Sequence, residues 1–282
     1  MKKINRRSFL AAAGLTVAAL ALTACGGSSS TASSAAASSV ASSAAASSEA
    51  ASAAATELTT VEAGKLTMAT NAAFPPYEMT TDAGEFEGID IDTAKAIAEK
   101  LGLELQIDDM DFDAALLSVQ QGKADIVMAG VTVTDERKAV MDFSDSYATG
   151  IQSIIVPEGS DITSPDDLAG KKIGTQRGTT GYIYCSDDFG DDAVVAYDDG
   201  LTAVQALNNG QVDAVVIDNA PAKEFVAANP GLVILDTSYA EEDYAIGLAK
   251  GSALEDAVNA ALEELKADGT LQSIVDKYIT AE

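Results

Sequence analysis

Two segments of this chain repeat one pattern at a constant distance in the sequence. Residues 203–218 match residues 115–130 at an offset of 88 positions, with a helical stretch, a glycine, an aspartate and a short apolar strand in the same order. The second copy ends on Asp218, where the first has Gly130. A repeat of this kind indicates two similar structural units. A chance similarity between two helix–glycine–strand segments is the alternative.

Strand and helix patterns alternate along the chain. In the first half, the expected elements are a strand at Lys65–Thr70, a helix from Asp90 to Leu101, a strand at Leu103–Ile107, a helix ending at Gln121 and a strand at Asp125–Ala129. In the second half they include a strand at Lys172–Thr175 and a last helix at Ala253–Asp268, which carries an apolar stripe. This alternation is typical of parallel sheets with helices on both faces. The sequence therefore predicts an α/β fold of two lobes, each a mostly parallel sheet flanked by helices.

The N-terminal residues predict export. A basic start that includes Arg6 and Arg7 precedes the apolar run Phe9–Leu22, which is too short to span a bilayer comfortably. We therefore expect residues 1–24 to be a signal peptide. The twin arginines resemble a twin-arginine signal, and a general secretory signal is equally compatible with them.

The end of the signal resembles the lipobox of bacterial lipoproteins. The motif is Leu22-Thr23-Ala24-Cys25, and the resemblance implies that Cys25 becomes the lipidated first residue of the mature chain. A plain secretory signal with an incidental cysteine is the alternative. Residues 25–56 are almost all serine and alanine and predict a flexible, lipid-anchored linker. The expected location is extracytoplasmic, with a lipid anchor to the cell membrane.

Charge and composition exclude several classes of function. Without the signal, 13 basic residues face 44 acidic ones, a net charge of −31, which makes nucleic acid an implausible partner. The chain has no histidine, which excludes the usual zinc sites and cysteine–histidine or serine–histidine catalysis. We expect no metal and no cofactor. Cys185 has no intrachain disulfide partner once Cys25 is lipidated, so no role is expected for it.

The stretch from Asp125 to Lys138 is the first candidate for chemistry. An apolar strand ends at Gly130, and Thr134 then precedes acidic residues as a helix N-cap. Unpaired backbone N–H groups at such a turn face an anion, and Arg137 adds a forked cation suited to a carboxylate. An ordinary capped surface helix, whose arginine pairs with a neighbouring acid, is the alternative.

Ligands of open α/β sheets bind beyond the carboxyl ends of the strands, and each lobe has candidates there. We expect Arg137 and the Thr132 backbone to bind a carboxylate, and Asp218 to bind an ammonium group. An anionic and a cationic end held in opposite lobes match a zwitterion that closes the lobes. The nine candidate ligand-binding residues are Asn71, Phe74, Phe112, Gly130, Thr132, Arg137, Gln176, Thr180 and Asp218. Phe74 and Phe112 could instead be core aromatics, and Asp218 a helix N-cap.

Several motifs together resemble one family, the polar amino acid solute-binding proteins of bacterial ABC importers. They run in the family's order over residues 60–280: Ala73–Glu78, Phe86–Asp92, Ala129–Arg137, Asp142–Ser144, Gly178–Thr180 and Ile217–Asn219. The resemblance implies the type II periplasmic-binding-protein fold and a chain that crosses between lobes near 148–153 and 242–244. Lobe 1 would then comprise 57–150 and 244–282, and lobe 2 would comprise 151–243.

The resemblance also assigns roles to residues of the site. It implies that Arg137, Thr132 and Thr180 hold the α-carboxylate of an amino acid, and that Gly130, Thr132 and Asp218 hold its α-ammonium group. The implied protein is a monomer that delivers its ligand to an ABC transporter permease. Asn71 and Gln176 occur together in arginine-binding relatives, which favours a basic amino acid over glutamine. Arg177 would oppose a cationic side chain if it pointed inward, and the sequence does not orient it.

Two other functions remain compatible with these patterns. Some dehydratases of cyclic carboxylates share the fold, but no catalytic acid is marked in this sequence, so we do not expect an enzyme. A sensory lipoprotein that binds the same ligand without a transporter would have the same site.

Overall fold

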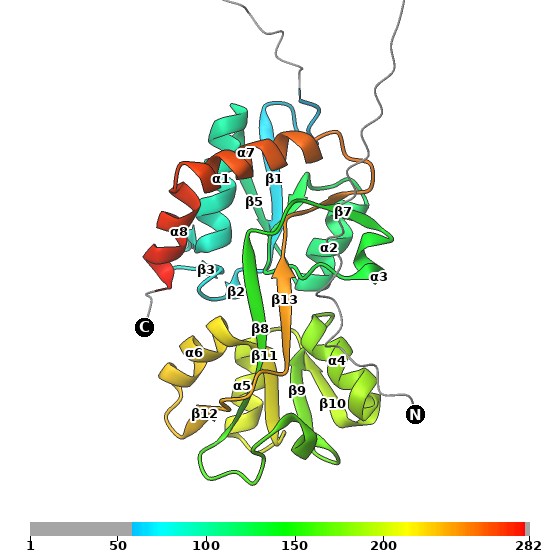
Figure 1. Cartoon of the computed structure of the whole chain (residues 1–282), viewed down its shortest axis with the longest axis vertical. Coiled ribbons are helices and arrows are strands. Elements are labelled where there is room, and N and C mark those ends of the chain that lie inside the picture. Colours follow the sequence, from blue (N-terminus) through cyan, green and yellow to red (C-terminus); the bar gives the residue numbers. More distant parts are fainter. Residues whose placement is uncertain (1–57, 280–282) are drawn as a thin grey trace, which may run out of the picture. The chain divides into compact units, whose positions relative to one another are not determined.

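The computed structural model of the chain describes residues 58–279 (Figure 1). The expected signal peptide, Cys25 and the serine- and alanine-rich linker lie outside the described residues. No described helix is both long and apolar enough to cross a membrane.

The first sheet has five strands in the order β5-β1-β6-β14-β7. The strands β1 (Lys65–Thr70), β5 (Glu104–Asp109) and β6 (Ile126–Val127) are parallel, and β14 (Gly247–Ala249) and β7 (Met141–Phe143) are antiparallel to their neighbours. A small sheet of β2 (Ala73–Phe74), β3 (Glu78–Thr80) and β4 (Phe86–Glu87) follows β1 in the chain.

Five helices belong to this first lobe. They are α1 (Ile89–Leu101), α2 (Phe112–Gln120), the single turn α3 (Asp135–Lys138), α7 (Glu255–Ala267) and α8 (Thr270–Tyr278). Helices α1, α7 and α8 pack on one another, and α2 packs against β1 and β14. As expected, α1 ends at Gly102, whose left-handed φ of 68° suits a residue without a Cβ.

The second sheet is built on the same plan. Its order is β10-β9-β11-β8-β12, and β13 also pairs with β8. The strands β9 (Ile173–Gln176), β10 (Val194–Tyr197) and β11 (Ala214–Asp218) are parallel, whereas β8 (Ala148–Pro157), β12 (Leu232–Ile234) and β13 (Ala240–Tyr244) supply antiparallel pairs. The helices of this lobe are α4 (Thr180–Phe189), α5 (Gly200–Asn208) and α6 (Asn219–Ala228), with short 3-10 turns at Pro165–Leu168 and Asp191–Ala193.

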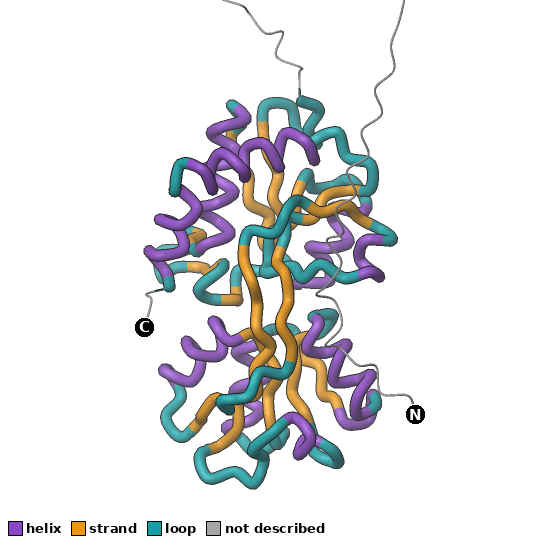
Figure 2. Tube along the Cα trace, viewed as in Figure 1, coloured by secondary structure: helices purple, strands orange, loops and turns teal. Residues whose placement is uncertain are grey.

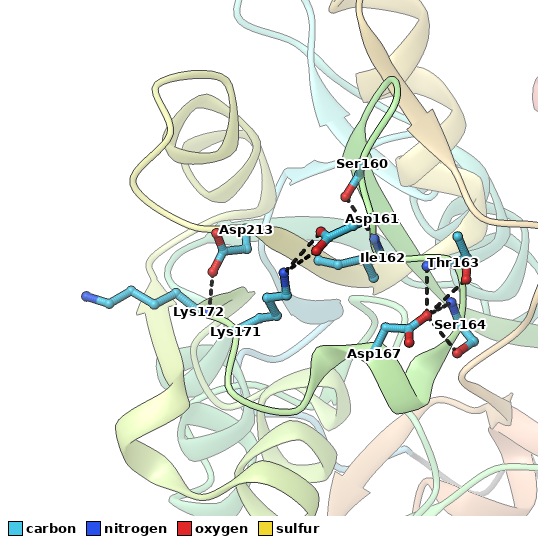
Figure 3. Close-up of polar contacts among 9 residues, drawn as sticks. All are labelled: Ser160, Asp161, Ile162, Thr163, Ser164, Asp167, Lys171, Lys172 and Asp213. Atoms are coloured by element: carbon cyan, nitrogen blue, oxygen red, sulfur yellow. Dashed lines mark hydrogen bonds and ion pairs between the residues drawn. The ribbon is translucent and has the colours of Figure 1, made fainter.

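The repeat seen in the sequence is a repeat in space. In each lobe a helix leads to a strand that pairs in parallel with the first parallel strand of the sheet, α2 to β6 on β1 and α5 to β11 on β9. The two matched aspartates, Asp125 and Asp213, accept equivalent hydrogen bonds from the backbone. Asp125 Oδ2 accepts from the backbone N–H of Thr67 at 2.8 Å, and Asp213 Oδ2 accepts from that of Lys172 at 2.7 Å (Figure 3). The predicted two-lobed α/β fold is confirmed.

The loop before β9 is held by its own polar side chains. Asp167 Oδ2 accepts from the backbone N–H groups of Thr163 and Ser164, both at 3.0 Å, and Lys171 pairs with Asp161 at 3.0 Å (Figure 3). These contacts lie on the surface and contribute little energy. They fix the entry to β9, the strand that ends at Gln176.

Two strands connect the lobes. β8 and β13 pair from Ala148 opposite Tyr244 to Gln152 opposite Ala240, and they run side by side between the two sheets (Figure 2). The residues expected near the crossings, 148–153 and 242–244, lie on these two strands.

Two details of the predicted secondary structure were wrong. The strand expected at Asp125–Ala129 is only Ile126–Val127, because its neighbour β14 pairs with it over two residues only. The helix expected to be the last is followed by α8, which begins after Gly269, a glycine in the left-handed region at a φ of 80°. The apolar stripe on α7 is buried as predicted.

Candidate functional site

All nine candidate ligand-binding residues line one cleft. It contains about 400 Å³ of space free of protein atoms, and it lies where β1, β6, β9 and β11 end. The first lobe contributes the loops after β1 and β6 with the starts of α2 and α3. The second lobe contributes the end of β9, the start of α4 and the end of β11. The sequence therefore predicted which residues come together, and the position agrees with the rule for open α/β sheets.

Arg137 is a buried cation in this cleft. Only 8% of it is exposed, its Nη1 donates to the Thr132 carbonyl at 2.8 Å and its Nη2 donates to the Gly178 carbonyl at 3.2 Å. The guanidinium carbon lies 5.3 Å from the centre of the Phe112 ring. No acidic side chain in the described part of the chain forms an ion pair with it. Burial lowers the pKa of Arg137, and five N–H donors are more than its two hydrogen bonds use.

Asp218 is the buried anion of the second lobe. Its Oδ1 accepts from the Ala220 N–H at 2.9 Å as the N-cap of α6, and its Oδ2 accepts from the Ile151 N–H at 2.8 Å. The Tyr244 side chain lies near this carboxylate and opposes the rise in its pKa. Burial raises the pKa of Asp218 to about 6. The helix cap proposed as an alternative is therefore present, and the same carboxyl group also lines the cleft.

Gly130 must be a glycine at its place in the cleft. Its φ is 55°, and a Cβ there would lie 2.9 Å from Cε1 of Phe74. Its backbone N–H donates to Asp90 Oδ2 at 3.0 Å. The Phe74 ring stacks on Tyr77 with centres 5.8 Å apart, and Tyr77 meets Tyr244 edge-on at 5.4 Å. Phe74 is thus both a core aromatic and a cleft residue.

Polar side chains of the two lobes meet across the cleft. Gln176 Nε2 donates to Asn71 Oδ1 at 2.9 Å, and the hydroxyls of Thr132 and Thr180 lie 3.3 Å apart. The Asn71 amide also donates to the Met110 carbonyl at 3.0 Å. These contacts fix the orientation of the Asn71 and Gln176 amide groups in the cleft.

A buried carboxyl pair, which was not predicted from the sequence, lies beside the cleft. Glu78 is fully buried and lines the cleft, and it lies against Asp90, which is also fully buried. Burial, with the charge of Asp90 as the next cause, raises the pKa of Glu78 well above its ordinary value, and burial raises the pKa of Asp90 to about 6. Neither Glu78 oxygen nor Asp90 Oδ1 has a hydrogen-bond partner among the described residues, so two negative charges here would be costly and at least one carboxyl group keeps its proton. An acid inside the aromatic motif Phe74–Glu78 was the available signal.

Other residues of the cleft also escaped the sequence analysis. Gln152 and Tyr244 line it from the two crossing strands, Ala129 and Ile217 from the ends of β6 and β11, and Thr179 from the N-cap of α4. No alternation of apolar and polar residues marks β13 in the sequence, because it carries acids on both faces. Arg177, which the sequence could not orient, points to the rim: its side chain is 56% exposed and lies 3.5 Å from Asp198. Cys185 is buried in the core of the second lobe.

The described residues contain no group of three or more acidic or cysteine side chains that could hold a metal ion. The polar groups of the cleft are instead one guanidinium, two carboxyl groups, amides and hydroxyls. Such a set of groups is suited to bind a small polar molecule that carries both a positive and a negative charge.

The fold and the cleft define a two-lobed α/β binding protein, and comparison with known proteins identifies its family. Residues 66–281 match the bacterial extracellular solute-binding proteins, family 3, and the chain belongs to this family. It is 32% identical to a probable histidine-binding protein of Neisseria gonorrhoeae, over 99% of this chain and 98% of the relative. It is 33% identical to the arginine-binding extracellular protein ArtP of Bacillus subtilis, over 77% of this chain and 87% of the relative.

Solved structures give the same result. An ancestral arginine-binding protein bound to arginine is 43% identical, with a TM-score of 0.73, and the match covers 77% of this chain and 98% of that protein. The arginine-, lysine-, histidine-binding protein ArtJ of Geobacillus stearothermophilus is 34% identical, with a TM-score of 0.74 and coverage of 77% and 96%. All four relatives are named for the amino acids that they bind.

The buried carboxyl groups predict an unusual dependence of stability on pH. Asp90 keeps its proton up to about pH 6 in the folded chain but loses it near pH 4 when unfolded, because burial raises its pKa. The folded state binds more protons in this window, so the free energy of unfolding of the ligand-free protein should fall as the pH rises from about 4 to 6. Asp90→Asn should show a smaller decrease in the free energy of unfolding over this pH range. Urea unfolding of both proteins at several pH values measures that decrease.

Asp92→Asn is the matched control on the same helix. Burial raises the pKa of Asp92, but hydrogen bonds from Lys277 and Tyr278 outweigh this and lower it, so its contribution is lost as the pH falls. In the control variant, the free energy of unfolding should therefore still decrease between pH 4 and 6. Equal pH profiles for Asp90→Asn and the wild type would show that Asp90 is not the proton-binding group.

Proposed function

We propose that this protein captures an amino acid outside the cytoplasm by closing its two lobes, and delivers it to the permease of an ABC importer. A basic amino acid is the favoured ligand. The lobes would be residues 57–150 with 244–282, and residues 151–243, joined by β8 and β13. The protein would bind its ligand without chemical change, as the names of its relatives suggest.

The observation that carries the proposal is the buried guanidinium group of Arg137. It faces the cleft, has no carboxylate partner among the described residues and keeps unused N–H donors. Burial of an unpaired charge raises the free energy of the folded protein, and a bound group of opposite charge lowers it again. The α-carboxylate of an amino acid supplies that charge in the two-pronged geometry that arginine prefers.

The choice of a basic amino acid rests on the relatives named for arginine, lysine or histidine. Arg137 and Asp218 balance the two ends of a zwitterion in the cleft. Glu78 also lines the cleft, but burial raises its pKa well above the ordinary value, so it is not counted as a second negative charge.

The location would be the outer face of the cell membrane, with Cys25 as the lipidated residue. Cys25→Ala should then release the protein from membranes, because the variant has no thiol to carry a lipid. Fractionation of cells that express the variant and the wild type tests this proposal. Unchanged membrane association of Cys25→Ala would contradict the anchor, and the binding function would be unaffected by that result.

Arg137→Ala should strongly weaken the binding of L-arginine. Truncation of one partner of a buried charge pair costs about 2–5 kcal/mol, which weakens binding by roughly thirtyfold to several thousandfold. Isothermal titration calorimetry on the wild type and the variant measures the change.

Arg177→Ala is the matched control, because this arginine lies on the exposed rim with Asp198. It should keep the affinity within about fivefold of the wild type. Binding by Arg137→Ala within a few-fold of the wild type would refute the role of Arg137. A wild-type protein that shows no thermal shift with any of the common amino acids would refute the function as a whole.

A further inference from the structure

Glu242 is a buried acid that lies behind the cleft. It belongs to β13, one of the two strands that connect the lobes, and only 6% of it is exposed. Its Oε2 accepts from the Thr132 hydroxyl at 3.1 Å and from Gln152 Nε2 at 2.9 Å. Both donors belong to residues that line the cleft, whereas Glu242 itself does not line it. Nothing in the proposed function uses this carboxylate.

The contact with Glu242 decides the direction of the hydrogen bonds around Thr132. A threonine hydroxyl has one proton and two lone pairs. Because the proton of Thr132 goes to Glu242, this hydroxyl can only accept on its other side. The Thr180 hydroxyl, 3.3 Å away, must therefore be the donor in the contact between the two threonines. Toward the cleft, Thr132 is an acceptor.

The backbone holds this arrangement in register. Thr132 forms an antiparallel bridge with Tyr244, the Val133 N–H donates to the Asp243 carbonyl at 3.0 Å and the Ala245 N–H donates to the Val131 carbonyl at 3.1 Å. The loop that carries Thr132 is thus fastened to the strand that carries Glu242. The backbone of Glu242 therefore stays beside Thr132, and burial with the hydrogen bond from Gln152 Nε2 holds its carboxylate against the hydroxyl.

The charge of Glu242 also reaches the two charged groups of the cleft. Burial lowers the pKa of Arg137, and the charge of Glu242 raises it by a smaller amount. Burial is the main cause that raises the pKa of Asp218, and the charge of Glu242 raises it further. A positive group that enters the cleft beside Thr132 therefore meets an accepting oxygen and, behind it, a carboxylate.

We infer that Glu242 is a positioning residue that turns the proton of the Thr132 hydroxyl away from the cleft and so makes the site selective for an α-ammonium group. An ammonium group only donates hydrogen bonds, and it needs acceptors on every side. A hydroxyl in its place could use a donor as well. The inference rests on the proposed function, and it adds a residue that sets the discrimination between amino acids and hydroxy acids.

The test uses the ratio of two dissociation constants, that of the α-hydroxy analogue of L-arginine divided by that of L-arginine. Glu242→Gln keeps one accepting oxygen but loses the charge, and Glu242→Met has a similar shape and loses both. The ratio should fall about threefold in Glu242→Gln, which loses only the charge. It should fall about tenfold in Glu242→Met, because this variant also loses the hydrogen bond from the Thr132 hydroxyl. A loss of fold stability alone would weaken both ligands alike and leave the ratio unchanged.

Two comparisons separate the role of Thr132 from the role of charge. Glu241→Gln, the exposed neighbour on the same strand, removes the same charge without a contact to Thr132 and should keep the wild-type ratio. The variants Glu242→Gln and Glu242→Met are both uncharged, so the difference between them reports the accepting oxygen. In a Thr132→Val background, which has no hydroxyl to orient, that difference should disappear.

The outcomes are distinguishable from those of the proposed function. If the wild type binds L-arginine and the ratio stays the same in Glu242→Gln and Glu242→Met, the positioning role is overturned and the proposed function stands. If the difference between the two variants persists without the Thr132 hydroxyl, Glu242 acts by another route and the inference is overturned as well. A wild type that binds no amino acid would remove the basis of both.

Discussion

A guanidinium group taken out of water without a carboxylate partner is the interaction on which the rest of this structure depends. Arg137 is held by two backbone carbonyls, one from its own lobe and one, that of Gly178, from the other. Carbonyl oxygens solvate the charge in part but do not neutralise it. The cleft is therefore arranged around a missing negative charge, and a bound carboxylate would touch both lobes at once. A ligand shifts such a protein toward the closed state only by binding that state more strongly.

The duplicated architecture explains why the opposite charge lies across the cleft. In each lobe, a helix leads to a strand that ends at the sheet edge facing the cleft, and the two matched positions there are Gly130 and Asp218. A glycine at the first position leaves room for Phe74 and for the loop that carries Thr132. An aspartate at the second supplies a carboxylate. One repeated unit thus gives two strand ends with different chemistry, and together they match the two ends of an amino acid.

The sequence predicted the lobes and the nine cleft residues because strand ends, glycines and motif order are local signals. Arg137 and Arg177 show where such signals stop. Both lie next to turns rich in threonine and glycine, but one guanidinium is buried in the cleft and the other lies on the rim with Asp198. Glu78 and Glu242 could not be placed either, because their importance comes from Asp90 and Thr132, partners 12 and 110 residues away. Helix α8 was not predicted, because its apolar face is short and a glycine such as Gly269 usually marks the C-terminal end of a helix.

Small-angle X-ray scattering with ligands that each lack one charge tests the central claim most directly. L-Arginine should reduce the radius of gyration of the protein. Agmatine, which lacks the carboxylate, and 5-guanidinopentanoate, which lacks the α-amino group, should leave it unchanged at the same concentration. Citrulline, whose side chain is neutral, should reduce it only at higher concentration. If agmatine compacts the protein as well as arginine does, the buried charge of Arg137 does not drive closure, and this account of the cleft is wrong.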